Sequence, residues 1–408
     1  MSVEKKVVIV GAGQAGFMAA MSLRQQKFHG QIILIGCENH LPYQRPPLSK
    51  DFLLDQIEAE RLYLRPASFY EDKNIKVIIN KEVVNIDRQK KVVTLDDNSE
   101  QKYSKLVLTT GSNLKKLNFS CSGHNIYYLR SFSDSLKIRR ALNNTKKIVV
   151  LGAGYIGLEV AAAAIKKKVS VIVIEIEKSV MSRSLCKETS SFFLKKHKKE
   201  GVRFKLGVAV EDVKDHNHQK KIICSDGTSI ITDAVVVGIG IKPNIKLACN
   251  SGIACQNGIT VNEYGQTSDI NIFAAGDCTD HPNKILNQRL RLESVQNAVE
   301  QAKSVAAKIL GVEKPYNQVP WFWSDQYDIK LQIAGISSGY DQCVLRGNIS
   351  QEKFSVLYLK KKKVIAIDAI NDQKAFTTGK RLIQSKAKIP IKVLSNNKID
   401  LREIISET

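Results

Sequence analysis

The chain has 408 residues, of which 43% are hydrophobic and 25% are charged, enough for about two or three domains with their own cores. This composition excludes a disordered chain, a collagen-like fibre and a small disulfide-stabilised scaffold. The 62 basic and 40 acidic residues leave a formal net charge of +22, which indicates either an acidic partner or a general enrichment in lysine.

No apolar stretch reaches the roughly 18 residues that a membrane-spanning helix needs. The N-terminal segment lacks the long apolar core of a signal peptide, so we expect a cytoplasmic protein. The eight cysteines include no CxxC pair, which argues against a zinc ribbon, an iron–sulfur cluster and a thioredoxin-like dithiol. We therefore expect reduced packing cysteines and no metal site.

A glycine-rich motif follows the first predicted strand. Lys6–Val10 is a short, β-branched apolar run, which is typical of a buried strand. GAGQAG occupies residues 11–16, and residues 15–26 are predicted to be helical. A second strand, Gln31–Ile35, precedes Glu38. This order is typical of a dinucleotide site, with glycines for the turn and pyrophosphate, a helix N-terminus for phosphate charge and an acid for the ribose.

The same unit recurs in the middle of the chain. A strand is predicted over Ile148–Leu151, GAGYIG occupies residues 152–157, and residues 158–166 are predicted to be helical. Val169–Ile174 is the next strand, and Glu175 follows it. Two such units predict one flavin and one nicotinamide dinucleotide.

Five motifs occur in a fixed order along the chain. They are LPYQRPPLSK (41–50), GAGYIGLE (152–159), TSDINIFAAGD (267–277), ESV (293–295) and WFWSDQ (321–326). Together they resemble the FAD-containing, NADH-dependent ferredoxin reductases of bacterial cytochrome P450 and aromatic-ring dioxygenase systems. The resemblance extends from about residue 6 to about residue 371.

The resemblance implies an α/β fold with two Rossmann-like domains of the glutathione-reductase type and a C-terminal α/β domain. The FAD domain would comprise residues 1–112 and 245–320, and the NAD domain would be inserted as residues 113–244. Residues 321–408 would form the C-terminal domain.

The resemblance also implies which residues contact FAD. Lys50 would lie near the isoalloxazine N5, and otherwise would be a solvated lysine. Asp277 would accept the ribityl hydroxyls, and otherwise would cap a helix. Many relatives carry Asp where this chain has Cys37, so we expect Glu38 to take over the adenosine ribose. Trp323 would pack close to the flavin or belong to an ordinary core. The full set is Gly11, Gly13, Gln14, Ala15, Gly16, Glu38, Arg45, Lys50, Val83, Gly111, Arg130, Asp277, Val295 and Trp323.

For NADH, the implied contacts come from the second motif and its surroundings. Tyr155 would gate the flavin face, and Glu159 would lie beside the nicotinamide; the alternative for Glu159 is a helix-surface acid above Lys166. Lys50 and Glu159 are the catalytic candidates. The set is Gly152, Gly154, Tyr155, Ile156, Gly157, Glu159, Glu175, Arg183 and Gly240.

The implied reaction passes hydride from NADH to FAD and then single electrons to an acidic [2Fe-2S] ferredoxin. We expect a monomer whose docking face includes Arg289, Arg291 and Lys303, and no nucleic-acid or membrane partner. Two alternatives stay open. One is a cysteine-dependent enzyme that reduces peroxide, oxygen or a disulfide, although residues 39–50 contain no cysteine. The other is a regulatory flavoprotein related to apoptosis-inducing factor, suggested by the +22 charge. Basic runs such as Lys360–Lys363, which we predict to be a hairpin turn, lack the aromatic residues typical of nucleic-acid binding.

Overall fold

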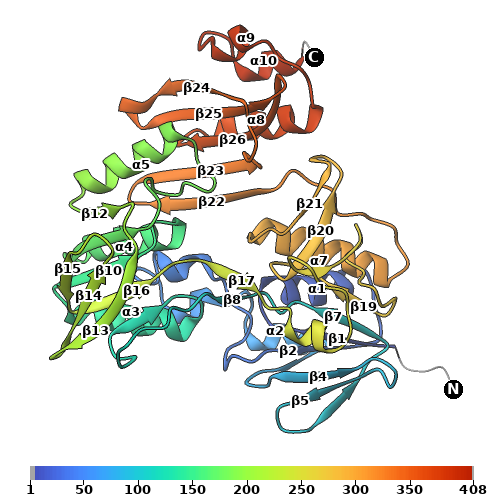
Figure 1. The fold of residues 1–408 in the computed structure, drawn as a ribbon. Coiled ribbons are helices and arrows are strands. Elements are labelled where there is room, and N and C mark those ends of the chain that lie inside the picture. Colours follow the sequence, from blue (N-terminus) through green and yellow to red (C-terminus); the bar gives the residue numbers. More distant parts are fainter. Residues whose placement is uncertain (1–4, 407–408) are drawn as a thin grey trace. The chain divides into compact units, whose positions relative to one another are not determined.

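The computed structural model describes residues 5–406, and they form two compact units (Figure 1). The first unit comprises the chain up to Gln44, Ala59–Asn113 and Lys242–Trp321. The second comprises Arg45–Glu58, Leu114–Ile241 and the chain from Phe322 onward. No helix within these described residues has the length and apolar character needed to cross a membrane. The division into three domains stays a prediction.

The first unit is built on a five-stranded parallel sheet in the order β19-β7-β1-β2-β3. These strands are β1 (Lys6–Val10), β2 (Gln31–Ile35), β3 (Ile75–Ile78), β7 (Lys105–Leu108) and β19 (Ile272–Ala274). Around them lie the helices α1 (Gln14–Gln25), α2 (Ala67–Asp72), α6 (Lys246–Asn250) and α7 (Val295–Ile309). Two small sheets complete the unit: β4 (Val83–Asp87), β5 (Val92–Leu95) and β6 (Glu100–Lys102), and β18 (Ile259–Thr260), β20 (Thr279–Asn283) and β21 (Gln288–Leu290).

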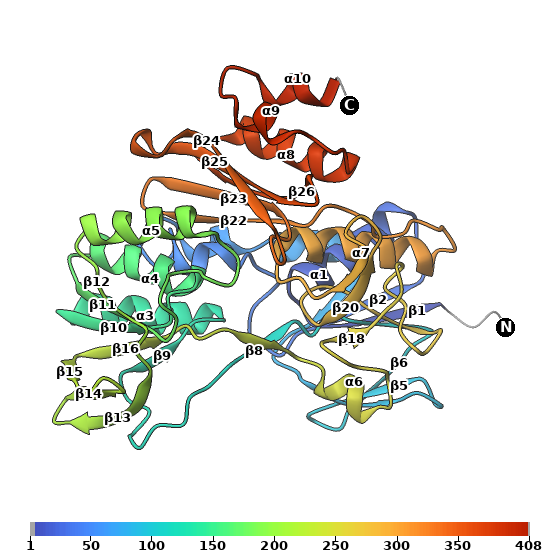
Figure 2. The same ribbon diagram turned by 45° about the horizontal axis from the view of Figure 1, so that its top comes forward.

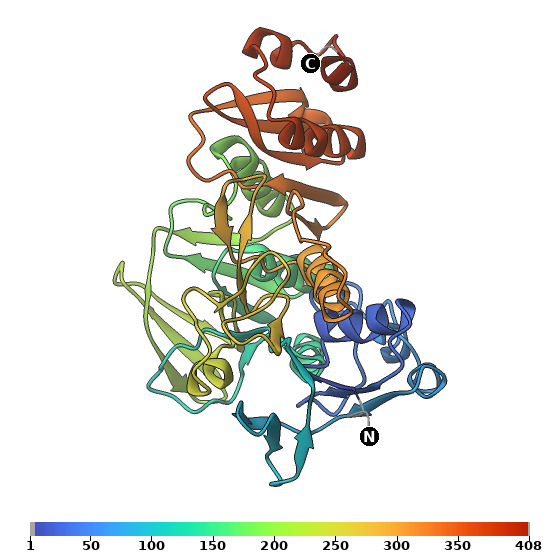
Figure 3. The same cartoon turned by 90° about the vertical axis from the view of Figure 1, so that its right-hand side faces the viewer.

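Both faces of this parallel sheet are covered, as its continuous apolar strands require. On β1, Val7 and Ile9 join the core formed with α1 and α7, which lie side by side (Figures 1 and 3). Val8 and Val10 join the opposite core, which includes residues of β4 and β5. Successive side chains of a strand point to opposite faces, so β1 supplies both cores and its C-terminal end is fixed beside α1.

The second unit repeats this plan with a parallel sheet in the order β12-β11-β10-β16-β9. Its strands are β9 (Ile126–Tyr128), β10 (Lys147–Leu151), β11 (Ser170–Glu175), β12 (Arg203–Leu206) and β16 (Ala234–Val237), and its helices are α3 (Phe132–Asn144), α4 (Tyr155–Lys166) and α5 (Lys187–Lys199). An antiparallel sheet of β13 (Val210–His216), β14 (Gln219–Cys224) and β15 (Ser229–Thr232) adjoins it. Two short strands, β8 (Ser112–Leu114) and β17 (Ile241–Pro243), pair where the chain passes between the units.

The C-terminal part of the chain adds a five-stranded sheet in the order β22-β23-β26-β25-β24 (Figure 2). The strands are β22 (Trp321–Gln326), β23 (Ile329–Gly335), β24 (Gln342–Asn348), β25 (Lys353–Lys360) and β26 (Lys363–Ile370), followed by α8 (Gln373–Ser385), α9 (Ile391–Ser395) and α10 (Leu401–Ser406). The predicted hairpin at Lys360–Lys363 is confirmed, with positive φ at both central lysines. Phe192 of α5 packs on Phe354 of β25 with ring centroids 5.0 Å apart, so this sheet shares a core with the parallel sheet. The predicted α/β fold is confirmed.

Candidate glycine-loop and carboxylate sites

A glycine loop follows the strand β1 in the first sheet and the strand β10 in the second. The first position of each loop requires glycine. Gly11 has a φ of +113°, and a Cβ there would lie 2.2 Å from the carbonyl oxygen of Thr109. Gly152 has a φ of +100°, and its Cβ would lie 2.5 Å from the carbonyl oxygen of Gly238. A side chain at either position would be both strained and in collision with backbone. The protein's own packing therefore requires these two glycines.

The middle glycines of the two loops face open space instead. A Cβ at Gly13 or at Gly154 would meet no protein atom within 4 Å. These residues precede α1 and α4, and neither helix has a side-chain cap at its N-terminus. The first-turn N–H groups and the positive end of the helix dipole are thus left for an anion. Both loops fit a dinucleotide pyrophosphate.

The acid after the second strand has a different partner in each unit. Glu38 accepts a hydrogen bond from the Tyr43 hydroxyl at 2.6 Å. Glu175, the last residue of β11, accepts one from the backbone N–H of Ala153 at 2.6 Å. Glu175 is therefore held against the glycine loop of the second unit. Cys37, beside Glu38, is exposed.

The two catalytic candidates form an ion pair in the second unit, in which Glu159 is buried and Lys50 is half-buried. Lys50 Nζ lies 2.8 Å from Glu159 Oε2, and the exposed fractions of the two side chains are 14% and 3%. The Ser49 hydroxyl donates to the same oxygen at 2.5 Å, and the Ser324 hydroxyl donates to Oε1 at 2.6 Å. The alternatives of a solvated Lys50 and a helix-surface Glu159 are both wrong. The carboxylate gains three donors that offset the cost of burying its charge.

Three segments converge on Glu159. It lies on α4, two residues after the last glycine of its loop, while Ser49 ends the short 3₁₀ helix Pro46–Ser49. Ser324 comes from β22. Both serines belong to motifs that carried the family resemblance, PPLSK and WSDQ. Sequence reasoning missed them as functional residues, although these motifs were the available signal.

Tyr155 and Trp323 belong to the same two elements. Tyr155 lies one turn before Glu159 on α4, its hydroxyl lies 2.8 Å from Ser184 Oγ, and its ring packs edge-on to Phe322 at 4.5 Å. Side chains alternate along a strand, so Phe322 and Ser324 share the face toward α4. The half-buried Trp323 lies on the other face of β22.

The remaining predicted flavin contacts are distributed between both units. The first unit holds Gly11, Gly13, Gln14, Ala15, Gly16, Glu38, Val83, Gly111, Asp277 and Val295, and the second holds Arg45, Lys50, Arg130 and Trp323. Arg45 donates to the carbonyl oxygen of Arg130 at 2.6 Å, which joins two of them. Asp277 lies in the turn between β19 and β20, 3.5 Å from Ser112 Oγ. It caps no helix, so that alternative is wrong.

All the predicted NADH contacts lie in the second unit. Ile156 is exposed on the first turn of α4. A Cβ at Gly240 would lie 4.0 Å from a guanidinium nitrogen of Arg183, so these two residues are neighbours. The NADH set is thus confined to one unit, in contrast to the flavin set.

Each basic residue of the predicted docking face has an acidic partner. Arg289 pairs with Asp280 at 3.2 Å and Lys303 with Glu300 at 2.6 Å. Arg291 pairs with Glu293. Each positive charge is therefore partly neutralised within the first unit. Sequence reasoning treated these charges as available to a partner.

Cysteine chemistry gains no support from the thiols. Burial raises the pKa of Cys186, Cys224 and Cys278 above its ordinary value, and the pKa of Cys343 is raised to about 11. A raised pKa leaves less of the reactive thiolate. Across residues 5–406 no group of three His, Cys, Asp or Glu side chains is arranged to hold a metal ion.

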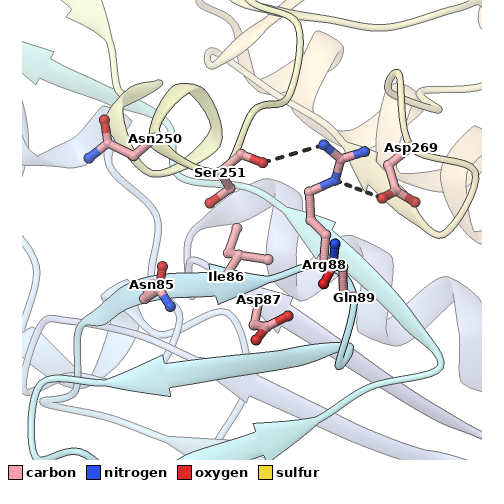
Figure 4. A pocket seen from close by; sticks show the side chains of 8 residues that line it. All are labelled: Asn85, Ile86, Asp87, Arg88, Gln89, Asn250, Ser251 and Asp269. Carbon is pink, nitrogen blue, oxygen red and sulfur yellow. Dashed lines mark hydrogen bonds and ion pairs between the residues drawn. The ribbon is translucent and has the colours of Figure 1, made fainter.

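Two hollows of the surface lie away from these residues. The larger has a volume of about 680 Å³ in the first unit, where Arg88 pairs with Asp269 at 2.9 Å (Figure 4). The smaller, of about 240 Å³, lies beside Tyr127 and Lys137 in the second unit. Neither is lined by a predicted site residue.

Comparison with known proteins gives full-length matches. Residues 5–302 match the family model of pyridine nucleotide-disulphide oxidoreductases, and residues 321–405 match the reductase C-terminal model. Putidaredoxin reductase of Pseudomonas putida is 38% identical over 100% of this chain and 98% of its own. Rhodocoxin reductase of Rhodococcus erythropolis is 39% identical over 98% of this chain and 94% of its own.

Two solved structures match along the whole chain. One is the covalent putidaredoxin reductase–putidaredoxin complex, with a TM-score of 0.95, 38% identity and coverage of 99% of this chain and 98% of that one. The other is the ferredoxin reductase for the CYP199A2 system of Rhodopseudomonas palustris, with a TM-score of 0.95, 38% identity and coverage of 98% and 100%. The chain therefore belongs to the ferredoxin reductase family that includes putidaredoxin reductase and rhodocoxin reductase, within the pyridine nucleotide-disulphide oxidoreductases, a family that implies FAD and NAD(P)H.

Proposed function

We propose that this chain is an NADH-dependent ferredoxin reductase that serves a cytochrome P450 or a ring-hydroxylating oxygenase. NADH and two oxidised [2Fe-2S] ferredoxins would yield NAD⁺, a proton and two reduced ferredoxins, with bound FAD supplying the conversion from a two-electron donor to one-electron acceptors. The observation that carries the proposal is the Lys50–Glu159 ion pair, whose buried carboxylate lies on the helix that follows the second glycine loop. The full-length relatives support it.

The first glycine loop would hold the FAD. The uncapped N-terminus of α1 and the open space at Gly13 suit the pyrophosphate. Glu38 would bind the adenosine ribose in place of the acid that Cys37 replaces, and Asp277 would bind the ribityl chain. The residues that would complete this site are Gly11, Gln14, Ala15, Gly16, Arg45, Lys50, Val83, Gly111, Arg130, Val295 and Trp323.

The second glycine loop would hold NADH rather than NADPH. Glu175 would accept the ribose hydroxyls, and its carboxylate would repel a 2′-phosphate. Its bond to the Ala153 N–H supports this role, because it keeps the carboxylate at the loop. The other residues of this site would be Gly152, Gly154, Tyr155, Ile156, Gly157, Arg183 and Gly240.

Lys50 and Glu159 would act as a charge pair for hydride transfer. The Lys50 ammonium would favour the negative charge that the flavin gains on reduction. The Glu159 carboxylate would favour the positive charge that the nicotinamide ring gains as it loses hydride. Because both groups are held by hydrogen bonds before the reaction, they need no reorganisation during it.

The ferredoxin would be an acidic partner that binds transiently to the monomeric reductase. The net charge of +22 supports fast, salt-dependent association. Because Arg289, Arg291 and Lys303 share their charges with carboxylates, their contribution to docking stays a prediction.

The test measures electron transfer from NADH to putidaredoxin, the partner in the homologous complex. We expect NADH-dependent reduction of putidaredoxin that weakens at high salt and that Lys50→Met slows. The matched control is Lys167→Met, which removes a lysine that pairs with Asp55 in the same unit. Reduction of ferricyanide but of no [2Fe-2S] protein would contradict the proposal.

A further inference from the structure

A chain of polar side chains runs from the Glu159 carboxylate through the second unit. The Ser324 hydroxyl lies 2.6 Å from Glu159 Oε1, and Gln326 Nε2 lies 3.1 Å from Ser324 Oγ. Gln326 Oε1 lies 2.8 Å from His197 Nε2. The Tyr327 hydroxyl lies 3.0 Å from His197 Nδ1. The chain joins α4, β22 and α5, and no part of the predicted site includes its last three residues.

Most of this chain is removed from solvent. Ser324 and His197 have no exposed surface, and Gln326 is 1% exposed. Only Tyr327, at the far end, is half-buried. Buried polar groups cost free energy unless each is hydrogen-bonded, and an apolar core of similar volume is often at least as stable. Structural stability therefore does not by itself account for this chain.

The ionised carboxylate fixes the direction of every bond. Glu159 can only accept, so the Ser324 proton points to it, and Ser324 must receive an N–H from Gln326. The Gln326 oxygen then faces His197, which must carry its proton on Nε2. Nδ1 is left as an acceptor for the Tyr327 hydroxyl. The tautomer of His197 thus depends on a carboxylate three hydrogen bonds away.

This chain of hydrogen bonds also gives the two oxygens of Glu159 different partners. Oε2 receives Ser49 and Lys50, whereas Oε1 receives Ser324. Without the Ser324 bond the carboxylate could turn about its terminal torsion, which is broad. Lys50 would then lose its fixed partner atom.

We propose that Ser324, Gln326, His197 and Tyr327 are positioning residues that hold the Glu159 carboxylate in one orientation for hydride transfer. This inference rests on the proposed function for its catalytic consequence. The hydrogen-bond direction that it requires can be measured independently of NADH.

The first test determines the His197 tautomer by NMR of the FAD-bound protein labelled with ¹⁵N-histidine, the signal being assigned by its loss in His197→Gln. We expect at least about tenfold more of the Nε2–H than of the Nδ1–H form. In Ser324→Ala the Gln326 amide can flip, so the two forms should mix. A predominant Nδ1–H form in the unaltered protein, or an unchanged ratio in Ser324→Ala, would overturn the inference.

The second test measures the single-turnover rate of flavin reduction by NADH. His197→Phe removes both ring bonds, and we expect about a tenfold slower rate with little change in NADH affinity. His197→Gln restores one donor and one acceptor, so it should recover most of the rate. The control is Ser190→Ala, on the same helix, which removes a buried hydroxyl that donates to the Val180 carbonyl at 2.7 Å.

Equal losses in His197→Phe and Ser190→Ala would mean a structural role only and would overturn the inference, as would an unchanged rate in a folded His197→Phe protein. If His197→Phe fails to fold, Tyr327→Phe and Ser324→Ala take its place with the same expected direction. A protein that NADH does not reduce at all contradicts the proposed function, and the tautomer measurement still decides the direction of the chain.

Discussion

The two glycine loops share a backbone geometry, and the helices that follow them carry different residues two positions after the last glycine. In each loop a strand, a positive-φ glycine and an unobstructed middle glycine lead into a helix. Two residues after the last glycine, the first helix carries Met18, which packs on the apolar core. The second helix carries Glu159, which collects two hydroxyls and an ammonium. The backbone thus provides a cradle for a dinucleotide in both units, while a single side chain gives the second its reactive charge.

The strongest test of this difference replaces Glu159 on α4 with methionine, the residue that α1 carries at the corresponding position, Met18. Glu159→Met should destabilise the protein by roughly 3–5 kcal/mol, because it leaves the charge of Lys50, whose side chain is only 14% exposed, without its partner. The double variant with Lys50→Met should recover most of this loss. Urea unfolding measures both, and additive losses in the double variant would contradict the pairing.

Each unit also buries one neutral histidine. Burial lowers the pKa of His197 and of His281 from the ordinary value of 6.5 to about 4. The unfolded chain binds these protons below pH 6.5 and the folded protein binds them only near pH 4. Stability is therefore fully present above pH 6.5 and is lost as the pH falls toward 4, by about 1.4 kcal/mol per pH unit for each group.

The two histidines differ in their partners, which gives a matched pair of variants. Both ring nitrogens of His197 are hydrogen-bonded, whereas those of His281 have no hydrogen-bond partner in the described part of the chain. We expect His197→Phe to lose stability at pH 7 and His281→Phe to keep it. Both should flatten the decline between pH 6.5 and pH 4, as urea unfolding across this range would show. A decline as steep as in the unaltered protein would argue against both lowered pKa values.

The middle glycines test which loop holds which nucleotide. Gly13 and Gly154 have negative φ values, −91° and −77°, and their Cβ positions are open, so alanine should leave folding unaffected. Gly13→Ala should weaken FAD binding about a hundredfold, about 2.7 kcal/mol, while Gly154→Ala should keep FAD and weaken NADH binding. The ratio of flavin to protein absorbance and a NADH titration measure these effects. FAD loss from Gly154→Ala alone would reverse the assignment.

The smallest expected effect is on the preference for NADH over NADPH, which we assign to Glu175. Glu175 should favour NADH over NADPH by about tenfold, about 1.4 kcal/mol, because its carboxylate would repel the extra phosphate. Glu175→Gln should narrow the ratio of kcat/KM values for NADH and NADPH, and the control Glu38→Gln, which changes the acid after the second strand of the first unit, should not. Equal kcat/KM for the two nucleotides in the unaltered protein would rule out this role.

The loops could be predicted from the sequence because their glycines, strands and helices are adjacent in the chain. The environment of Glu159 could not, because its hydroxyl partners Ser49 and Ser324 lie 110 and 165 residues away. The spacing above Lys166 left a surface acid open as the alternative, whereas the helix is buried on nearly every side. The ion pairs of Arg289, Arg291 and Lys303 were missed because the prediction considered these basic residues without their acidic neighbours. The local geometry of a motif can therefore be predicted from the sequence, whereas contacts between distant motifs become visible only in the folded structure.

The segment Arg45–Glu58 folds with the second unit although residues of the first unit flank it on both sides. During synthesis this early segment leaves the ribosome long before α4 and β22, which hold the rest of the Glu159 environment. Such distant pairing slows folding, because loop closure must precede the contacts that reward it. The second unit cannot be cut out as a continuous piece either. A fragment beginning at residue 114 lacks Lys50 and Ser49, and its buried carboxylate would have lost its cation.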